Sequence, residues 1–382
     1  MKRRYFDLLR VLAILAVFAT HVTIFCPPAL SSSLWVGGHN VSWLLLGPAW
    51  GGVWIFFVLA GYLTGKGFSA GRYVLTLAGV RRFWWNRFLR ICVPYYFAVF
   101  VVVVLTAPRL LDVSGWPTLV RMLTFTYYDW LPHAPLSQTW FVSTLVQLML
   151  LAPLVALALT PLLKKPRLAG LVAIALMLAG TLVRVAPLLR HPGTDIGVWW
   201  PSWMYIPVWA NLDLFMVGFL VNAATRPPAS RTGWWLRPTP VLTAFAALWF
   251  VTTWVAFHGL ILGIQTSSRV LAIGGPLAWT AITALWICMA EARPAQLVTV
   301  GRWRSRWWLL VEAGAAVSYG VYLWHVPILQ SISSVIYAPT PIGVWAMLFV
   351  SGLALTLAMA AITRVTVERA ASRLRRDARV GG

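Results

Sequence analysis

The sequence predicts an all-α fold, a polytopic membrane helix bundle of about ten transmembrane helices with both termini in the cytoplasm. Composition is the first observation behind this prediction, because the 382 residues are 60% hydrophobic and only 10% charged, whereas a soluble domain is about 25% charged. The second is a series of apolar stretches of about 20 residues, the length that crosses a hydrocarbon core of about 30 Å. The third is the concentration of basic residues between those stretches.

Ten apolar stretches follow one another along the chain, and we expect each to form a transmembrane helix. They are, in order, Leu8–Pro28, Gly47–Gly65, Ile91–Ala107, Trp140–Leu163, Leu168–Pro187, Ile206–Ala223, Thr239–His258, Val270–Ala290, Gly314–Tyr337 and Ile342–Val365. No segment between them can bury a core of its own, so residues 1–382 are expected to form a single integral-membrane domain. The Arg-rich tail, about residues 366–382, is expected to rest on anionic lipid at the cytoplasmic surface.

The basic residues sort to one side of the predicted bundle. If the stretches alternate in direction from a cytoplasmic N-terminus, most of the 31 lysines and arginines fall in cytoplasmic segments. Those expected outside or near an outer helix end are Arg109, Arg121, Arg184, Arg190 and Arg269. This positive-inside bias is typical of a multi-pass protein of the cell (plasma or inner) membrane. It accounts for the net charge of +22 without a nucleic-acid partner.

The first predicted helix carries an acid, a base and an imidazole. Arg10 and His21 are eleven residues apart in the sequence, which is about three turns, so both lie on one face about 16 Å apart along the helix axis. Asp7 falls within about 40° of the same line. Ionisable groups inside a membrane are costly and mark a functional site by default. We expect Asp7 to pair with Arg10 or Arg4 and to offset the cost of burying those charges.

Basic residues also cluster at the cytoplasmic end of the third predicted helix, where Arg81, Arg82, Arg87 and Arg90 precede Pro94. The cluster is either a topology signal or a site for a polyanion, because guanidinium groups pair bidentately with phosphates. Arg87 and Arg90 are spaced i, i+3 and share a helix face, which suits a diphosphate.

Two other helices carry candidate polar residues, and one carries glycines. Ser318, Tyr322 and His325 share one face of the ninth predicted helix, so a hydroxyl, a phenol and an imidazole form a stripe. Either this stripe belongs to a site or its members are bonded inside the bundle. At the start of the fourth helix, Trp140 is more typical of an aromatic anchor at the outer interface. The small residues within Gly51–Tyr62 favour close helix packing.

Taken together, these motifs resemble the membrane-bound acyltransferase 3 family, in the expected order and over nearly the whole chain. The resemblance rests on Asp7…Arg10…His21, Phe56-Phe57…Gly61-Tyr62, Arg87-x-x-Arg90…Pro94 and Ser318-Tyr319-x-x-Tyr322-Leu-x-His325. It implies an enzyme that moves an acyl group, often acetyl, from coenzyme A to a hydroxyl of a sugar, an envelope glycan or a glycosylated natural product. Acyl-CoA is then a co-substrate, and neither a permanently bound cofactor nor a metal is expected.

Two positions depart from the family's usual pattern. Ala60 stands where the family often has Ser, and Leu145-Val146 stand where many members have a Glu pair. No role of those side chains carries over to this chain.

The resemblance assigns roles to the site residues. His21 is the expected catalytic base, because an imidazole titrates near neutrality, and Arg10 is expected along the acyl-donor route with Asp7 as its partner. The arginines expected to hold the phosphates of coenzyme A are Arg87, Arg90 and Arg82, with Arg302 and Arg304 in support. The residues expected to support the site are Ser318, Tyr319, Tyr322, His325 and Trp140. Of these, His325 and Tyr322 are expected either to donate to the oxyanion or to relay a proton.

The acceptor is the least specified part of the prediction. Tryptophans that could stack on sugar rings at the outer side are Trp35, Trp43, Trp116, Trp130, Trp199, Trp200 and Trp203, although a membrane-interface belt has the same composition. A carbohydrate or glycoside acceptor is therefore expected, together with the lipid bilayer as the protein's surroundings. The alternative is a secondary transporter or channel that uses the intramembrane Arg, His and Asp as an ion or substrate path.

Overall fold

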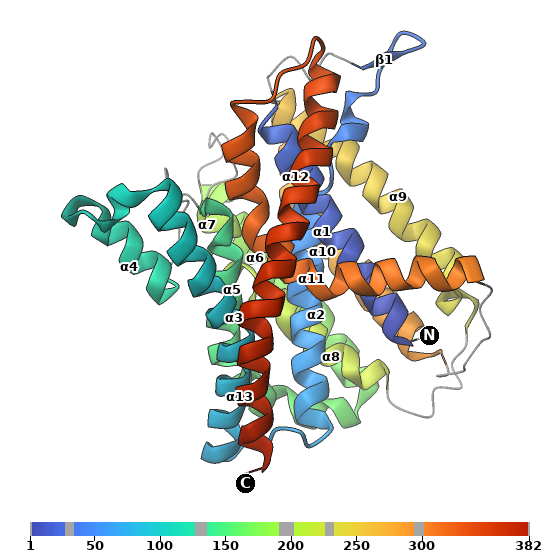
Figure 1. Cartoon of the computed structure of the whole chain (residues 1–382). Coiled ribbons are helices and arrows are strands. Elements are labelled where there is room, and N and C mark those ends of the chain that lie inside the picture. Colours follow the sequence, from blue (N-terminus) through green and yellow to red (C-terminus); the bar gives the residue numbers. More distant parts are fainter. Residues whose placement is uncertain are drawn as a thin grey trace.

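The computed structural model of this protein describes residues 2–26, 34–126, 136–190, 202–225, 233–293 and 302–380. Nearly all of these residues are helical, and the helices pack into one bundle (Figure 1). Within the described ranges, nine helices are long and apolar enough to span a membrane. The predicted all-α, polytopic membrane bundle is therefore confirmed.

The elements have the following bounds. The long helices are α1 (Lys2–Ile24), α2 (Ala49–Ser69), α3 (Leu77–Thr106), α5 (Trp140–Leu159), α6 (Pro166–Arg190), α9 (Pro238–Ala256), α10 (Gln265–Glu291), α11 (Arg302–Ser333) and α12 (Pro341–Thr363). The short helices are α4 (Trp116–Thr124), α7 (Ser202–Tyr205), α8 (Leu212–Ala224) and α13 (Arg369–Val380). Strands β1 (Trp35–Val36) and β2 (His39–Asn40) form an antiparallel hairpin in which Trp35 pairs with Asn40.

Tighter or wider helical turns, denoted η, join or extend these helices. They are η2 (Ser42–Leu45), η3 (Pro108–Leu111), η4 (Val113–Gly115), η5 (Ser137–Thr139), η6 (Thr160–Lys164), η7 (Val208–Ala210), η8 (Trp234–Leu236), η9 (Phe257–Ile261) and η10 (Arg364–Glu368). Of these, η10 continues α12 directly into α13, so the Arg-rich tail is a helical extension of the bundle.

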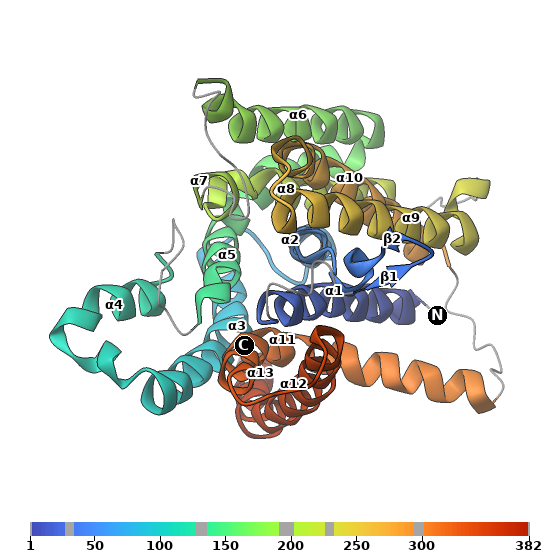
Figure 2. The same cartoon turned by 90° about the horizontal axis from the view of Figure 1, so that it is seen from above.

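Helix α2 lies at the centre of the bundle and packs against α1, α8 and α10. Seen from above, α11, α12 and α13 cover the far side of α1, while α6 lies beyond α8 and α10 (Figure 2). Helices α3 and α5 form an edge of the bundle, and α4 lies outside them (Figure 2). This arrangement brings the first helix, which carries the predicted site, against α2 and α11.

The contact between α2 and α8 depends on glycine. A Cβ atom added to Gly61 would lie 1.9 Å from the carbonyl oxygen of Phe215, and one added to Gly218 would lie 2.1 Å from that of Val58. Real Cβ atoms do not approach so closely, so the two backbones touch because these positions lack side chains. The packing interpretation of the glycine motif is confirmed.

Helix α8 is shorter than the predicted sixth stretch. Its 13 residues extend about 20 Å, less than the roughly 30 Å of a hydrocarbon core. Its first turn carries Asp213, which accepts two hydrogen bonds from Arg184 on α6 with N–O distances of 3.0 and 2.8 Å. Arg184 also donates to the carbonyl oxygen of Ala210, at 2.7 Å. Although Arg184 was expected near an outer helix end, it is only 3% exposed and is part of a buried ion pair.

Helix α11 is longer than the predicted ninth stretch, Gly314–Tyr337. Its first part lies crosswise to the other helices, and the rest turns to run along the bundle (Figure 1). The upright part corresponds to the predicted transmembrane segment. The crosswise part exposes Trp307, Leu309 and Leu310, as expected of a helix that lies in a membrane interface.

The two ends of the chain lie toward the same end of the molecule. Helix α1 rises from the N-terminus, whereas α12 and α13 descend to the C-terminus (Figure 1). This arrangement agrees with both termini on one side of a membrane. Their assignment to the cytoplasm stays a prediction from the basic residues.

Candidate active site

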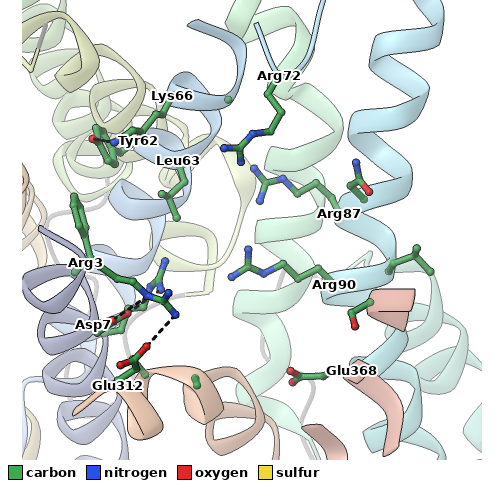
Figure 3. A pocket seen from close by; sticks show the side chains of 18 of the residues that line it. Arg3, Asp7, Tyr62, Leu63, Lys66, Arg72, Arg87, Arg90, Glu312 and Glu368 are labelled. Carbon is green, nitrogen blue, oxygen red and sulfur yellow. Dashed lines mark hydrogen bonds and ion pairs between the residues drawn. The ribbon is translucent and has the colours of Figure 1, made fainter. Parts of the chain in front are cut away.

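A cavity of about 890 Å³ opens among α1, α2, α3, α11 and η10. We call it the basic cavity, because the charged residues that line it are mainly Arg and Lys. They are Arg3, Asp7, Arg10, Lys66, Arg72, Arg87, Arg90, Glu291, Glu312, Arg364 and Glu368. Arg72, Arg87 and Arg90 lie along one wall, with their guanidinium groups pointing into the open space (Figure 3). Such a wall suits a ligand with several negative charges.

Arg87 is held in place by an aromatic ring. Its guanidinium carbon lies 5.1 Å from the ring centroid of Phe83, which is fully buried. The Nε atom of Arg87 is buried and has no hydrogen-bond partner among the described residues. Because the Phe83 ring limits the freedom of this side chain, the charged end is already oriented toward the cavity.

The opposite wall carries the acid of the first helix. Asp7 is 6% exposed, and its carboxylate lies 3.5 Å from Arg10 and 3.7 Å from Arg3. Arg3 also pairs with Glu312 at 3.3 Å (Figure 3). The expected pairing of Asp7 with Arg10 is confirmed, whereas Arg4 instead lies over an indole ring of α11, 5.6 Å from its centroid.

A second ion pair at this cavity joins α2 to α10. Lys66 and Tyr62 both donate to the carboxylate of Glu291, and Lys66 also donates to the hydroxyl of Tyr62 at 3.2 Å. The charge of Lys66 is therefore balanced within the protein. In the sequence, the only indication of this pair is that Lys66 and Glu291 each come directly after a predicted transmembrane stretch.

A narrower cavity of about 200 Å³ leads inward from the basic cavity. We call it the apolar channel, and it shares Arg10, Arg87 and Arg90 with the basic cavity. Its remaining lining is mostly apolar and aromatic, and it includes Phe56, Leu59, Ala60, Leu63, Ile91, Phe141, Leu145, Met149, Ser318, Tyr319 and Tyr322. A charged group at the mouth and an apolar group within could therefore bind as one molecule.

The apolar channel ends against a row of three rings. The ring of Tyr322 lies 5.6 Å from that of His325, and the His325 ring contacts that of His21 edge to face at 4.7 Å. His21 itself is absent from the lining of both cavities. The structure thus brings His21 and His325 together, with His325 one ring and His21 two rings beyond the Tyr322 ring that lines the channel.

Both imidazoles have a fixed hydrogen-bond partner. Nδ1 of His21 lies 2.8 Å from the carbonyl oxygen of Val17, and Nδ1 of His325 lies 2.8 Å from that of Tyr322. A carbonyl oxygen only accepts, so each neutral ring carries its proton on Nδ1 and keeps a lone pair on Nε2. His325 is fully buried, and its Nε2 has no hydrogen-bond partner among the described residues.

The residues around the rings join α11 to α3 and to η5, the turn that precedes α5. Tyr322 donates to the carbonyl oxygen of Gln138, whose side chain donates to Leu323 O at 3.3 Å. Tyr319 donates to the carbonyl oxygen of Ile91 at 2.7 Å. These bonds fix the polar stripe of the ninth predicted helix on its neighbours.

Two other supporting residues differ in their contacts. Ser318 lines the apolar channel, and its hydroxyl donates to Ala315 O of its own helix at 2.9 Å. Trp140 is 5% exposed and packs against Tyr205 with ring centroids 4.4 Å apart. The interpretation of Trp140 as an interfacial anchor is wrong, because a buried ring does not lie at a lipid–water surface.

The comparisons with known proteins agree with this geometry. The family model described as an acyltransferase domain, of the acyltransferase 3 type, matches residues 3–362. The chain belongs to this acyltransferase family. The family resemblance drawn from the motifs is thereby confirmed, and with it the expectation of an enzyme that transfers groups other than amino-acyl groups.

One similar protein is the peptidoglycan O-acetyltransferase OatA of Listeria monocytogenes serovar 1/2a. It is 24% identical over 355 residues, which are 89% of this chain and 51% of that protein. The chain thus spans about half the length of this curated relative. No solved structure matches the chain significantly.

The residues at the two positions where this chain departs from the family's usual pattern line cavities. Ala60 and Leu145 line the apolar channel, and Val146 lines a further cavity between α3 and α5. Where many acyltransferase 3 proteins have hydroxyl and carboxyl groups, this chain has apolar side chains. At these positions the cavity walls of this member are therefore apolar.

Some of the predicted donor-site residues are not brought to the basic cavity. Arg82 lines the cavity between α3 and α5 instead. Several residues singled out from the sequence lie outside the described part of the structure. Among the arginines predicted to support the donor, these are the side chains of Arg302 and Arg304. Among the tryptophans predicted for the acceptor, these are the side chain of Trp203 and residues Trp130, Trp199 and Trp200. The sequence reasoning missed Arg72, Arg364 and Glu368, which lie in a turn and in η10. Their only signal was their position in segments expected to face the cytoplasm.

Among the described residues, no group of three or more His, Cys, Asp or Glu side chains is placed to hold a metal ion. The cysteines are free thiols, and those at positions 26 and 92 are buried.

Proposed function

We propose that this multi-pass membrane protein is an O-acyltransferase that moves an acyl group, most simply acetyl, from acyl-CoA to a hydroxyl of a carbohydrate or a glycosylated compound. The observation that carries the proposal is that the basic cavity adjoins the apolar channel, which reaches Tyr322, and that the rings of His325 and His21 pack in a row behind Tyr322. This arrangement offers charge for a nucleotide, an apolar passage for a thioester arm and imidazoles beyond it.

The donor would bind from the cytoplasmic side. Arg72, Arg87 and Arg90 would pair with the phosphates of coenzyme A, since guanidinium forks match phosphate oxygens. Arg10 is shared by the basic cavity and the apolar channel, and it would meet the donor where its charged part gives way to the pantetheine arm. Asp7 would hold Arg10 and limit the cost of its charge.

His21 would act as the base. Because its Nδ1 proton is donated to Val17 O, the Nε2 lone pair is available to accept the proton of the acceptor hydroxyl. The alcohol oxygen would form a bond to the thioester carbon, the C–S bond would break, and the proton would pass to the leaving thiolate. The products are an ester and free coenzyme A.

His325 would relay this proton. In its neutral form it donates only from Nδ1, and that proton is already bonded to Tyr322 O, so it has no proton for an oxyanion. Its buried Nε2 can accept one. Of the two roles left open by the sequence, proton relay therefore fits the hydrogen bonds better than oxyanion stabilisation.

The acceptor would enter from the outer side of the plasma or inner membrane. His21 lies near the C-terminal end of α1, which the basic residues predict to be the outer end. The relative OatA is named for O-acetylation of peptidoglycan, which is a carbohydrate polymer and supports a sugar hydroxyl as the acceptor. The exposed Trp35 and Trp116 stay candidates for stacking on sugar rings.

The test uses the purified chain with acetyl-CoA, a mixture of cell-wall glycan fragments and a thiol reagent. Acceptor-dependent release of free coenzyme A is expected from the wild type, and His21→Ala should abolish it while the protein remains monodisperse in detergent. Near wild-type release from His21→Ala would remove His21 from the chemistry. If vesicles take up substrate without thiol release, the protein is instead a transporter.

A further inference from the structure

A third cavity, of about 780 Å³, lies between α3 and α5, which form an edge of the bundle with the short helix α4 outside them (Figure 2). We call it the lateral groove. Arg81 and Arg82 line one end of it, and the rest of the lining is mostly apolar, with Phe88 and Leu150 in it and Arg87 as a third charged residue. Leu150 is 56% exposed. An apolar groove with charge at one end matches a molecule with an anionic head and an apolar tail.

We propose that the lateral groove binds one anionic phospholipid of the cytoplasmic leaflet. The lipid phosphate would pair with Arg81 and Arg82, since clustered basic residues at this level attract anionic headgroups. An acyl chain would lie along Phe88 and Leu150. From Arg82 to Cys92, both lining residues, α3 rises about 15 Å, which equals the depth of one leaflet of a core about 30 Å thick.

Hydrogen bonds hold the elements that line the lateral groove. Phe125, the residue that follows α4, lines the groove, and its carbonyl oxygen accepts hydrogen bonds from Ser143 at 2.6 Å and Gln147 at 2.8 Å. Near the charged end, Trp84 donates to Met149 O at 3.2 Å. These bonds tie α4 and α3 to α5, so the groove keeps its width between fixed helices.

The bound lipid would share a wall with the donor path. Arg87, Ile91 and Met149 line both the lateral groove and the apolar channel. A lipid in the groove therefore supports, from the membrane side, the arginine proposed to hold the donor phosphates.

The experiment measures lipid binding without acyl-CoA, so its failure leaves the proposed acyltransferase function untouched. Delipidated protein in detergent is titrated with phosphatidylglycerol or phosphatidylcholine, and bound lipid is counted by native mass spectrometry. The wild type should bind one phosphatidylglycerol in preference to phosphatidylcholine. The double variant Arg81→Gln/Arg82→Gln should bind it about 30-fold more weakly, because each basic residue near the surface contributes about a factor of five.

Leu150→Trp should also remove the lipid, because the larger ring fills the groove without a change in charge. The matched controls are Arg167→Gln/Arg237→Gln, with two exposed arginines elsewhere, and Leu154→Trp, one turn further along α5 and outside the groove lining. Both should bind lipid as the wild type does. Equal binding of the two lipids, equal binding by all variants, or a second protein chain in place of lipid would overturn the proposal.

Discussion

The contact between His21 and His325 is the residue-scale feature with the most direct consequence for turnover. If His325 relays the proton, His325→Gln should lower kcat by about 10²- to 10⁴-fold, the usual contribution of a positioned acid or base. The KM for acyl-CoA should change little, because His325 lies beyond the end of the apolar channel. Steady-state thiol release measures both constants. A raised KM with an unchanged kcat would instead assign His325 to substrate binding.

A substitution in the arginine wall of the basic cavity should change KM rather than kcat. Arg87→Gln should raise the KM for acyl-CoA by about 10- to 100-fold, because a hydrogen bond between charged groups contributes about 1.5–3 kcal/mol. Arg167→Gln is the control, since this arginine is exposed at the start of α6 and lies away from the basic cavity. The thiol-release assay at varied acyl-CoA concentration gives the KM of both variants. An unchanged KM in Arg87→Gln would show that the phosphates of acyl-CoA bind elsewhere.

The sequence predicted those parts of the site that lie on one helix. The spacing of Asp7 and Arg10, and of Arg87 and Arg90, identifies shared faces, and both pairs line the basic cavity. It did not predict the bond of Lys66 to Glu291, because these residues are 225 positions apart and their contact exists only in the packed bundle. Periodicity reports which face a residue occupies, whereas pairing across helices depends on tertiary structure.

At the scale of elements, the contact of α2 with α8 is the most sensitive to added volume. Gly61→Ala should lower the free energy of unfolding by about 1–3 kcal/mol, the usual cost of overpacking, because the new methyl group would meet the backbone of Phe215. Gly170→Ala on α6 is the matched control, since nothing lies within 4 Å of its added Cβ. Thermal unfolding in detergent compares them. Equal melting temperatures would show that α2 and α8 can move apart freely.

The predicted helix bounds differ most from the observed ones where proline or charged residues interrupt an apolar stretch. The stretch Ile206–Ala223 reads as one span, but Pro207 and η7 precede a helix that begins only at Leu212. Conversely, the charged residues before Gly314 concealed the crosswise part of α11. Hydropathy identifies apolar length but not the direction in which a helix runs, so the bend in α11 could not be inferred.

For the whole molecule, the direction of the bundle in the membrane is the main prediction. In a chain whose native cysteines are replaced, Val36→Cys on the outer hairpin should react with an impermeant maleimide in right-side-out vesicles. Arg373→Cys in the C-terminal tail should react only after the vesicles are opened, because both termini are expected in the cytoplasm. Gel-shift labelling measures this. Labelling of both positions in sealed vesicles would contradict the positive-inside assignment.

The buried pair of Arg184 and Asp213 has a consequence for how the protein is made. As the chain leaves the ribosome, α6 reaches the insertion machinery before its carboxylate partner on α8 has been synthesised. An arginine costs about 2.5–3.5 kcal/mol at the centre of an isolated helix on biological insertion scales and less toward the helix end, where Arg184 lies in α6. Helix α6 should therefore become more stable in the bilayer once α8 arrives, which makes the order of synthesis part of assembly.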